Sequence, residues 1–174
     1  MIRLGRNYLA DIINKNGYDS FVEVGVKKGD FSHYIITNTN ALVIMVDPWT
    51  INVENKTPEE DWEFVNNRFK EFNLRAQLLR MDSLSAAKAM SNEKFDVVYI
   101  DALHDYESVK NDIDAWYPLV NDEGILAGHD YSDHWPGVLQ AVQEFADKNK
   151  YEITVLFGDE GPGPEPSWVI RKNK

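Results

Sequence analysis

The sequence has no cysteine, and this absence excludes disulfide bonds, thiolate metal sites and cysteine nucleophiles together. It has no apolar run near the ~20 residues that a membrane span needs, and the segment from Met1 to Asp11 carries two arginines without an apolar signal core. Positive charge is also scarce, since 18 Lys and Arg against 29 Asp and Glu give a net charge of −11. Phosphate-backbone binding needs clustered basic residues. We therefore expect a cytoplasmic protein without a membrane segment or a nucleic-acid partner.

The 174 residues suit one domain spanning 1–174, because no repeat, low-complexity tract or linker divides the chain. Apolar runs alternate regularly with turn-forming and helix-breaking residues. The runs predict strands at Ser20–Val24, Ala41–Val46, Ala76–Met81, Phe95–Ile100, Gly124–Ala127, Tyr151–Phe157 and Ser167–Arg171.

Helical patterns separate all but the last two of these strands. An N-terminal helix is predicted around Leu4–Lys15, and Thr57-Pro58-Glu59-Glu60 indicates the N-cap and first turn of another. Four more are predicted from near Asp30, around Leu84–Met90, around Tyr106–Trp116 and over Val138–Phe145. This order predicts an α/β fold with a doubly wound, mostly parallel sheet, in which the final hairpin reverses the last strand.

In such sheets, ligands bind beyond the carboxyl ends of the strands. Those ends read Glu23-Val24-Gly25, Asp47-Pro48-Trp49, Asp82-Ser83, Asp101-Ala102-Leu103-His104 and Gly128-His129-Asp130-Tyr131. A single aspartate at a strand end is more often a helix cap or a turn former. Five acids on one edge, however, repel one another unless a cation or a hydrogen-bond-rich ligand lies among them.

The turn after the first strand distinguishes two classes of cofactor. It has the pattern Gly-x-x-x-Gly, from Gly25 to Gly29, and it leads directly into a helix N-terminus. A dinucleotide site would have Gly-x-Gly-x-x-Gly, but Lys27 stands where the pyrophosphate needs a close glycine backbone. A cofactor without phosphates therefore fits this turn better than NAD does.

Taken in order, these motifs resemble the class I S-adenosylmethionine-dependent methyltransferases over almost the whole chain. They are similar in particular to small-molecule O-methyltransferases, a group that includes macrolide-sugar methyltransferases. The segments that carry the resemblance are Phe21–Gly25, Val46–Trp49, Tyr99–Glu107 and Gly128–Tyr131. The resemblance implies a Rossmann-like sheet of seven strands, S-adenosylmethionine as cofactor and a small-molecule acceptor.

The resemblance also implies roles for the cofactor-binding residues. Glu23 at the end of the first strand and Gly25 at the start of the turn would lie under the methionine part of the cofactor. Gly29, which closes the turn, would also belong to the cofactor site. Asp47 would accept hydrogen bonds from both ribose hydroxyls. Trp49 could stack on the adenine, line the acceptor pocket or belong to the core, and these alternatives stay open.

At the next two strand ends, the resemblance places the adenine and the reacting methyl group. Asp82 would accept from the adenine amino group while Ser83 caps the following helix. Asp101 would lie closest to the methyl group, and His104, three residues further on, would be the general base. The structural alternative for His104 is a histidine that caps its own helix.

A divalent ion is a second way to activate a hydroxyl. Asp101, His129 and Asp130 form a predicted oxygen-rich site suited to Mg²⁺ or a similar ion. Relatives often have two adjacent acids where this chain has His129-Asp130, and an acid where it has Leu103, so the metal remains an open alternative.

The acceptor class follows partly from exclusion. The Asp-Pro-Pro-Tyr type of signature of amino-group methyltransferases is absent after the fourth predicted strand, which favours the oxygen of a sugar or phenol. The pocket would be covered by Pro48–Lys56, Tyr131–Gly137, the N-terminal helix or a neighbouring subunit, which leaves a homo-oligomer open. The competing hypothesis is a non-catalytic accessory protein that binds S-adenosylmethionine without turnover.

Overall fold

A computed structural model describes residues 5–50, 57–158 and 165–173. The described residues form one seven-stranded sheet with the spatial order β3-β2-β1-β4-β5-β7-β6. Its strands are β1 (Ser20–Val24), β2 (Leu42–Asp47), β3 (Ala76–Arg80), β4 (Phe95–Ile100), β5 (Val120–Gly128), β6 (Thr154–Leu156) and β7 (Ser167–Arg171). The first five strands pair in parallel, and β7 runs antiparallel to both β5 and β6. The predicted doubly wound sheet with a reversed last strand is therefore confirmed.

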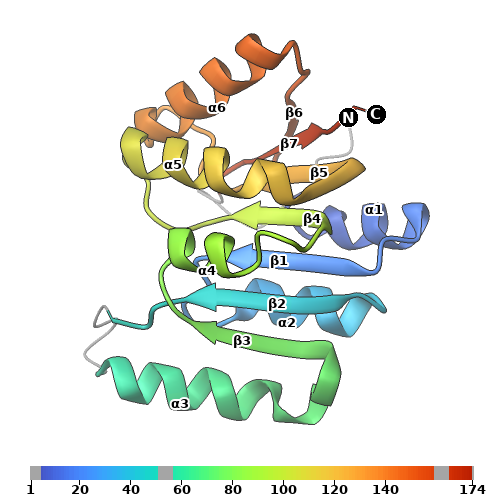
Figure 1. Ribbon diagram of the computed structural model, residues 1–174, viewed down its shortest axis with the longest axis vertical. Coiled ribbons are helices and arrows are strands. Elements are labelled where there is room, and N and C mark those ends of the chain that lie inside the picture. Colours follow the sequence, from blue (N-terminus) through green and yellow to red (C-terminus); the bar gives the residue numbers. More distant parts are fainter. Residues whose placement is uncertain (1–4, 51–56, 159–164, 174) are drawn as a thin grey trace.

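Helices cover both faces of the sheet (Figure 1). They are α1 (Tyr8–Asn16), α2 (Asp30–Asn38), α3 (Pro58–Phe69), α4 (Ser83–Ala89), α5 (Tyr106–Trp116) and α6 (Pro136–Asn149). Buried side chains of α1, α2 and α3 form one apolar cluster with the sheet, while those of α4, α5 and α6 form a second. Two cores separated by the sheet explain why the parallel strands are apolar on both faces.

The local sequence signals account for most element boundaries. Thr57 is the N-cap of α3 in a full capping box, since its hydroxyl accepts from the Glu60 backbone N–H and the Glu60 carboxylate accepts from the Thr57 N–H. Gly17 ends α1 in the left-handed conformation, with φ of 68°. The strands β1, β4 and β7 have the predicted bounds, whereas β5 begins earlier than predicted and β6 is shorter.

Two predicted segments extend outside the described residues. The N-terminal helix was expected from Leu4, which is outside them, and the described helix begins only at Tyr8. The expected pocket cover Pro48–Lys56 is described only as far as residue 50. Among the described residues, no helix has the length and apolar character that crossing a lipid bilayer requires.

The carboxyl ends of β1 and β4 approach each other more closely than side chains permit. A Cβ on Gly25 would lie 2.2 Å from the carbonyl oxygen of Asp101, and the φ of Gly25 is +88°. Only glycine has both the space and the backbone freedom for this position. The glycine therefore brings the two acidic strand ends together at one edge, where Figure 1 shows the arrowheads of β1 to β4.

We predict that Gly25→Ala destabilises the protein more than Gly17→Ala does. Both substitutions place alanine at positive φ, at a cost of about 1 kcal/mol, but a Cβ on Gly17 would meet nothing within 4 Å. The clash at Gly25 should add a further ~1–3 kcal/mol. Urea denaturation of the two variants gives the comparison, and equal losses would contradict the close approach of β1 and β4.

Candidate active site

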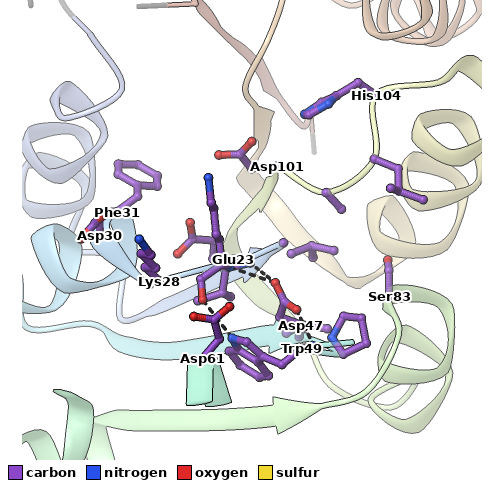
Figure 2. A pocket seen from close by; sticks show the side chains of 18 of the residues that line it. Glu23, Lys28, Asp30, Phe31, Asp47, Trp49, Asp61, Ser83, Asp101 and His104 are labelled. Carbon is purple, nitrogen blue, oxygen red and sulfur yellow. Dashed lines mark hydrogen bonds between the residues drawn. The ribbon is translucent and has the colours of Figure 1, made fainter. Parts of the chain in front are cut away.

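A cavity of about 750 Å³ opens at the carboxyl edge of the sheet. Figure 2 shows that Glu23, Asp47, Asp101 and His104 point toward it from the ends of β1, β2 and β4 and from the loop after β4. A volume of this size is typical of a pocket for a small molecule or cofactor. The strand-end acids at β1, β2 and β4 thus share one space.

The carboxylate of Asp47 holds the glycine turn after β1. Its Oδ2 atom accepts from the backbone N–H groups of Val26 and Lys27, each at 2.9 Å, and its Oδ1 atom accepts from the Trp49 N–H at 2.7 Å. These bonds fill the capacity of Oδ2 and leave one acceptor position on Oδ1. The turn, with Lys27 at φ 54°, is therefore fixed by the end of the neighbouring strand.

Trp49 belongs to the core and also lines the cavity. Its indole N–H donates to the Lys27 carbonyl at 2.9 Å, and its ring meets that of Trp62 edge-on at 4.9 Å. The hydrogen bond to Lys27 keeps the indole beside the glycine turn. Trp49 is therefore both a core residue and a residue of the cavity lining, and its stacking on the adenine stays a prediction.

Glu23 is buried at the floor of the cavity, where the Ser32 hydroxyl donates a hydrogen bond to it. Burial raises the pKa of Glu23 to about 8, against the opposing effect of the Ser32 hydrogen bond. The nearby Asp101 charge raises it further, and the Arg6 charge lowers it. Burial therefore favours the protonated carboxyl of Glu23 well above the ordinary pKa of a glutamate.

Asp101 contacts Arg6, a residue that no sequence motif places at this edge of the sheet. The Arg6 Nη1 atom lies 3.4 Å from Asp101 Oδ2, and the guanidinium lies 5.0 Å from the Phe31 ring centroid. Burial raises the pKa of Asp101 to about 6, while His129, Arg6 and His104 lower it and Asp130 raises it. The cavity lining is thus acidic near Asp101, and Arg6 is the arginine that contacts this acid.

Behind Asp101, two histidines flank the carboxylate of Asp130. His104 Nε2 lies 2.8 Å from Asp130 Oδ2, although its N–H is not aligned with that oxygen, and His129 Nδ1 lies 3.1 Å from Oδ1. The contact with Asp130 raises the pKa of His104, which burial opposes. Burial would raise the pKa of Asp130, but His104 and His129 outweigh it and hold this pKa far below its usual range. The His104 ring packs on Trp135 at 4.2 Å.

The structure brings a further imidazole to the predicted metal ligands. Single ligand atoms of Asp101, His104 and Asp130 lie within 4.8 Å of one another. The Nδ1 atom of His129, the predicted imidazole ligand, lies 3.9 Å from Asp101 Oδ1 and 3.1 Å from Asp130 Oδ1. The metal role of His129 stays a prediction, and His104, which was predicted only as a base, lies close enough to the same carboxylates to be a ligand.

Three other predicted site residues have local structural roles. Asp82, not Ser83, is the N-cap of α4, because its carboxylate accepts from the Ser85 N–H; Asp82 does not line the cavity. Ser83 lines the cavity, donates to Asp112 and accepts from the Trp116 indole. Gly29 does not line the cavity. It packs against the Phe69 ring, which a Cβ at this position would approach to 2.7 Å. Contacts of Asp82 and Gly29 with a cofactor remain predictions.

Asp61 is a second cavity residue that the sequence did not single out. It lies in α3, is 4% exposed, and its Oδ1 atom has no hydrogen-bond partner within the described part of the chain. Figure 2 shows its carboxylate beside Trp49. It follows Glu59 and Glu60 in the first turn of α3, and no motif of the sequence distinguishes it from them. A buried acceptor without a donor is costly unless a ligand supplies one.

Comparisons with known proteins agree with this geometry. A family profile described as a methyltransferase domain matches residues 22–131, which include most of β1, all of β2 to β5 and every described residue of the cavity lining except Arg6. No curated protein sequence matches the chain significantly. The fold, however, resembles many solved structures.

One similar structure is an O-methyltransferase from Bacillus cereus in complex with SAH (TM-score 0.73, 14% identity, covering 95% of this chain and 80% of that chain). Another is CalS11, a TDP-rhamnose 3'-O-methyltransferase of calicheamicin biosynthesis (TM-score 0.67, 17% identity, covering 95% of this chain and 78% of that chain). A third, from Clostridium thermocellum, is described as an rRNA methylase (TM-score 0.70, 15% identity, covering 100% of this chain and 98% of that chain). At these identities the likeness establishes the class I methyltransferase fold and leaves the acceptor undecided.

We predict that Glu23→Gln flattens the pH dependence of stability. Because the pKa of Glu23 is about 8 in the folded protein against an ordinary 4.5, the folded chain holds a proton that the unfolded chain has lost. The unfolding free energy of the wild type should therefore fall as the pH rises between these values. Urea denaturation at pH 6.5 and 8.5 measures the slope. The exposed Glu63→Gln is the control, and equal slopes in all three proteins would contradict a neutral Glu23.

Proposed function

The chain belongs to the methyltransferase-domain family, and we propose on that basis that it methylates a hydroxyl oxygen of a small acceptor such as a sugar or a phenol. The observation that carries the proposal is the shared cavity, into which the strand-end acids Glu23, Asp47 and Asp101 converge. S-adenosylmethionine, the cofactor of class I methyltransferases, supplies an electrophilic methyl group on a sulfonium. We further propose that 1–174 is a single methyltransferase domain.

The donor and acceptor groups of the cavity suit this cofactor. The cavity of about 750 Å³ has room for a nucleoside with an amino-acid arm. The carboxyls of Glu23 and Asp101 would face its ammonium and sulfonium, and the open position on Asp47 Oδ1 would take a ribose hydroxyl. Asp61, with its buried unpaired oxygen, offers an acceptor to a donor group of the ligand. The residues present therefore fit S-adenosylmethionine.

His104 would take the hydroxyl proton of the acceptor. The Asp130 carboxylate, 2.8 Å from Nε2, would favour a proton on that nitrogen even without an aligned hydrogen bond, and the Nδ1 lone pair would then be left to accept. S-adenosylmethionine would supply the methyl group and keep the electron pair of its carbon–sulfur bond, and His104 would accept the proton that the acceptor hydroxyl loses. The Asp130 carboxylate would then stabilise the imidazolium.

A divalent ion is the second candidate for activating the hydroxyl, and the grouping of Asp101, His104 and Asp130 within 4.8 Å favours it. Such an ion would supply Lewis acidity that lowers the pKa of a bound hydroxyl. Metal on one imidazole nitrogen leaves the proton on the other, so His104 would then be unable to act as the base. The two alternatives are therefore exclusive for this residue and can be separated by experiment.

A small acceptor is favoured over a polynucleotide by charge. The net charge of −11 and the acidic cavity wall oppose binding of a phosphate backbone. This is relevant because one of the similar structures is described as an rRNA methylase. The competing function, an accessory protein that binds the cofactor without turnover, predicts cofactor binding but no product with any acceptor.

Isothermal titration calorimetry with S-adenosylmethionine and S-adenosylhomocysteine tests the cofactor part of the proposal. We predict that Asp47→Ala weakens binding by about 2–3 kcal/mol, because it removes both a charge-assisted acceptor and the group that fixes the turn. Asp114→Ala, an exposed aspartate paired with Lys110, is the matched control and should bind normally. Tight NAD binding without S-adenosylmethionine binding would overturn the proposal. Unaltered affinity in Asp47→Ala would show that Asp47 has no role in cofactor binding.

For the base, we predict that His104→Gln lowers kcat by about 10²- to 10⁴-fold while cofactor affinity is kept. Since Asp130 raises the pKa of His104, the acidic limb of the wild-type profile should have its midpoint above the ordinary histidine value of about 6.5. A panel of sugars and phenols, assayed with and without Mg²⁺, supplies the acceptor. His33→Gln on α2, outside the cavity lining, is the control.

The metal alternative predicts a different pattern for the same proteins. EDTA should abolish turnover by the wild type, and Mg²⁺ or Mn²⁺ should restore it, if the group around His104 holds an ion. Full turnover in EDTA, together with a large loss of kcat in His104→Gln, would support His104 as the general base and exclude the metal. Near-normal kcat in His104→Gln would contradict both roles of this histidine.

A further inference from the structure

Arg6 lines the cavity beside the acidic residue Asp101, and the proposed chemistry assigns it no role. It lies just before α1, its guanidinium faces the Phe31 ring at 5.0 Å, and its Nη1 atom lies 3.4 Å from Asp101 Oδ2. We propose that Arg6 is the residue that binds the α-carboxylate of the cofactor's methionine part. This inference rests on the proposed function and concerns the same cavity.

The guanidinium has unused capacity for an anion. It carries five N–H donors in a planar fork, and Asp101 is its only hydrogen-bond partner in residues 5–50, 57–158 and 165–173. At 3.4 Å that contact is longer than a normal charge-assisted bond. The ring of Phe31 supports one face of the guanidinium and offers it no acceptor. Arg6 is thus positioned by packing while most of its donors remain available.

The charges around Arg6 match those of an amino acid. An α-amino acid carries its ammonium and its carboxylate on one carbon, so a complementary site needs an anion and a cation side by side. Asp101 touches Arg6, and Glu23 is close enough for the Arg6 charge to affect it. The two acids suit the ammonium, and the guanidinium fork suits bidentate contact with the carboxylate.

The other basic residues of the cavity lining are less suitable. Lys27 is exposed and Lys28 has contacts of its own, and both lie on the glycine turn that Asp47 holds. A lysine also lacks the planar fork that a carboxylate can bind with both oxygens. Among the described residues that line the cavity, Arg6 is therefore the one basic side chain in contact with Asp101.

Calorimetry with a matched pair of ligands tests this assignment. S-adenosylhomocysteine and its decarboxylated analogue both carry the adenosine, the sulfur and the ammonium, and they differ only in the carboxylate. The wild type should prefer S-adenosylhomocysteine by about 10- to 100-fold, as expected for a hydrogen-bonded charged group. In Arg6→Met the affinity for S-adenosylhomocysteine should fall by the same factor, while that for the analogue is unchanged, so the preference disappears.

Two further variants guard against a structural explanation. Arg6→Lys keeps the charge and loses the fork, so it should retain part of the preference. Arg80→Met, whose arginine pairs with Glu59 outside the cavity lining, should retain all of it. Thermal denaturation of each variant, without ligand, verifies that it is folded.

The remaining outcomes overturn the assignment in distinguishable ways. Equal weakening of both ligands in Arg6→Met would mean that Arg6 only shapes the cavity, and unaltered binding of both would remove it from the site. If Arg6→Met raised the KM of an anionic acceptor and left S-adenosylhomocysteine binding intact, the arginine would serve the acceptor instead. Failure of the wild type to bind either ligand would overturn the proposed function itself.

Discussion

The site depends on the hydrogen bonds that the Asp47 carboxylate accepts from the glycine turn. Without the bonds to Val26 and Lys27, the turn would lose the constraint that holds Lys27 at positive φ. The same turn places Glu23 at the floor of the cavity and lets Gly25 contact the backbone of Asp101. One carboxylate at the end of β2 thus organises the ends of its neighbours.

The second constraint is electrostatic. Burial raises the pKa of Glu23 and of Asp101, because both lose water and each lies near other acids. Asp130 is the exception, since His104 and His129 compensate its burial and keep it ionised. The edge therefore divides into one part in which the pKa of the acids is raised, around Glu23 and Asp101, and a second part in which Asp130 is paired with two histidines. The first part suits a cationic ligand, and the second suits proton transfer or metal binding. This division supports a cofactor at one end of the cavity and an acceptor at the other.

Much of the fold follows from local patterns. The capping box at Thr57 specifies the start of α3, and the apolar run Phe95–Ile100 specifies a strand covered on both faces. Acids directly after strands then share an edge, because parallel strands end on the same side. The bounds of β5 and β6 were less predictable. At the start of β5 the polar stretch Asn121–Glu123 lies between the residues Val120 and Ile125 that pair with β4, where the register shifts, and Asn121 donates to Asp96 from a distant part of the chain.

The order of strands and helices along the chain, the reversed last strand and the shared edge of Glu23, Asp47 and Asp101 can all be read from local patterns. The proximity of His104 to Asp101 and Asp130, and the positions of Arg6 and Asp61 in the cavity lining, are visible only in the folded chain. The physical reason is that these contacts join segments far apart in the chain through loop conformations and packing. Arg6 and Asp61 lie in no motif, so their positions depend on how α1 and α3 pack against the sheet rather than on any local pattern.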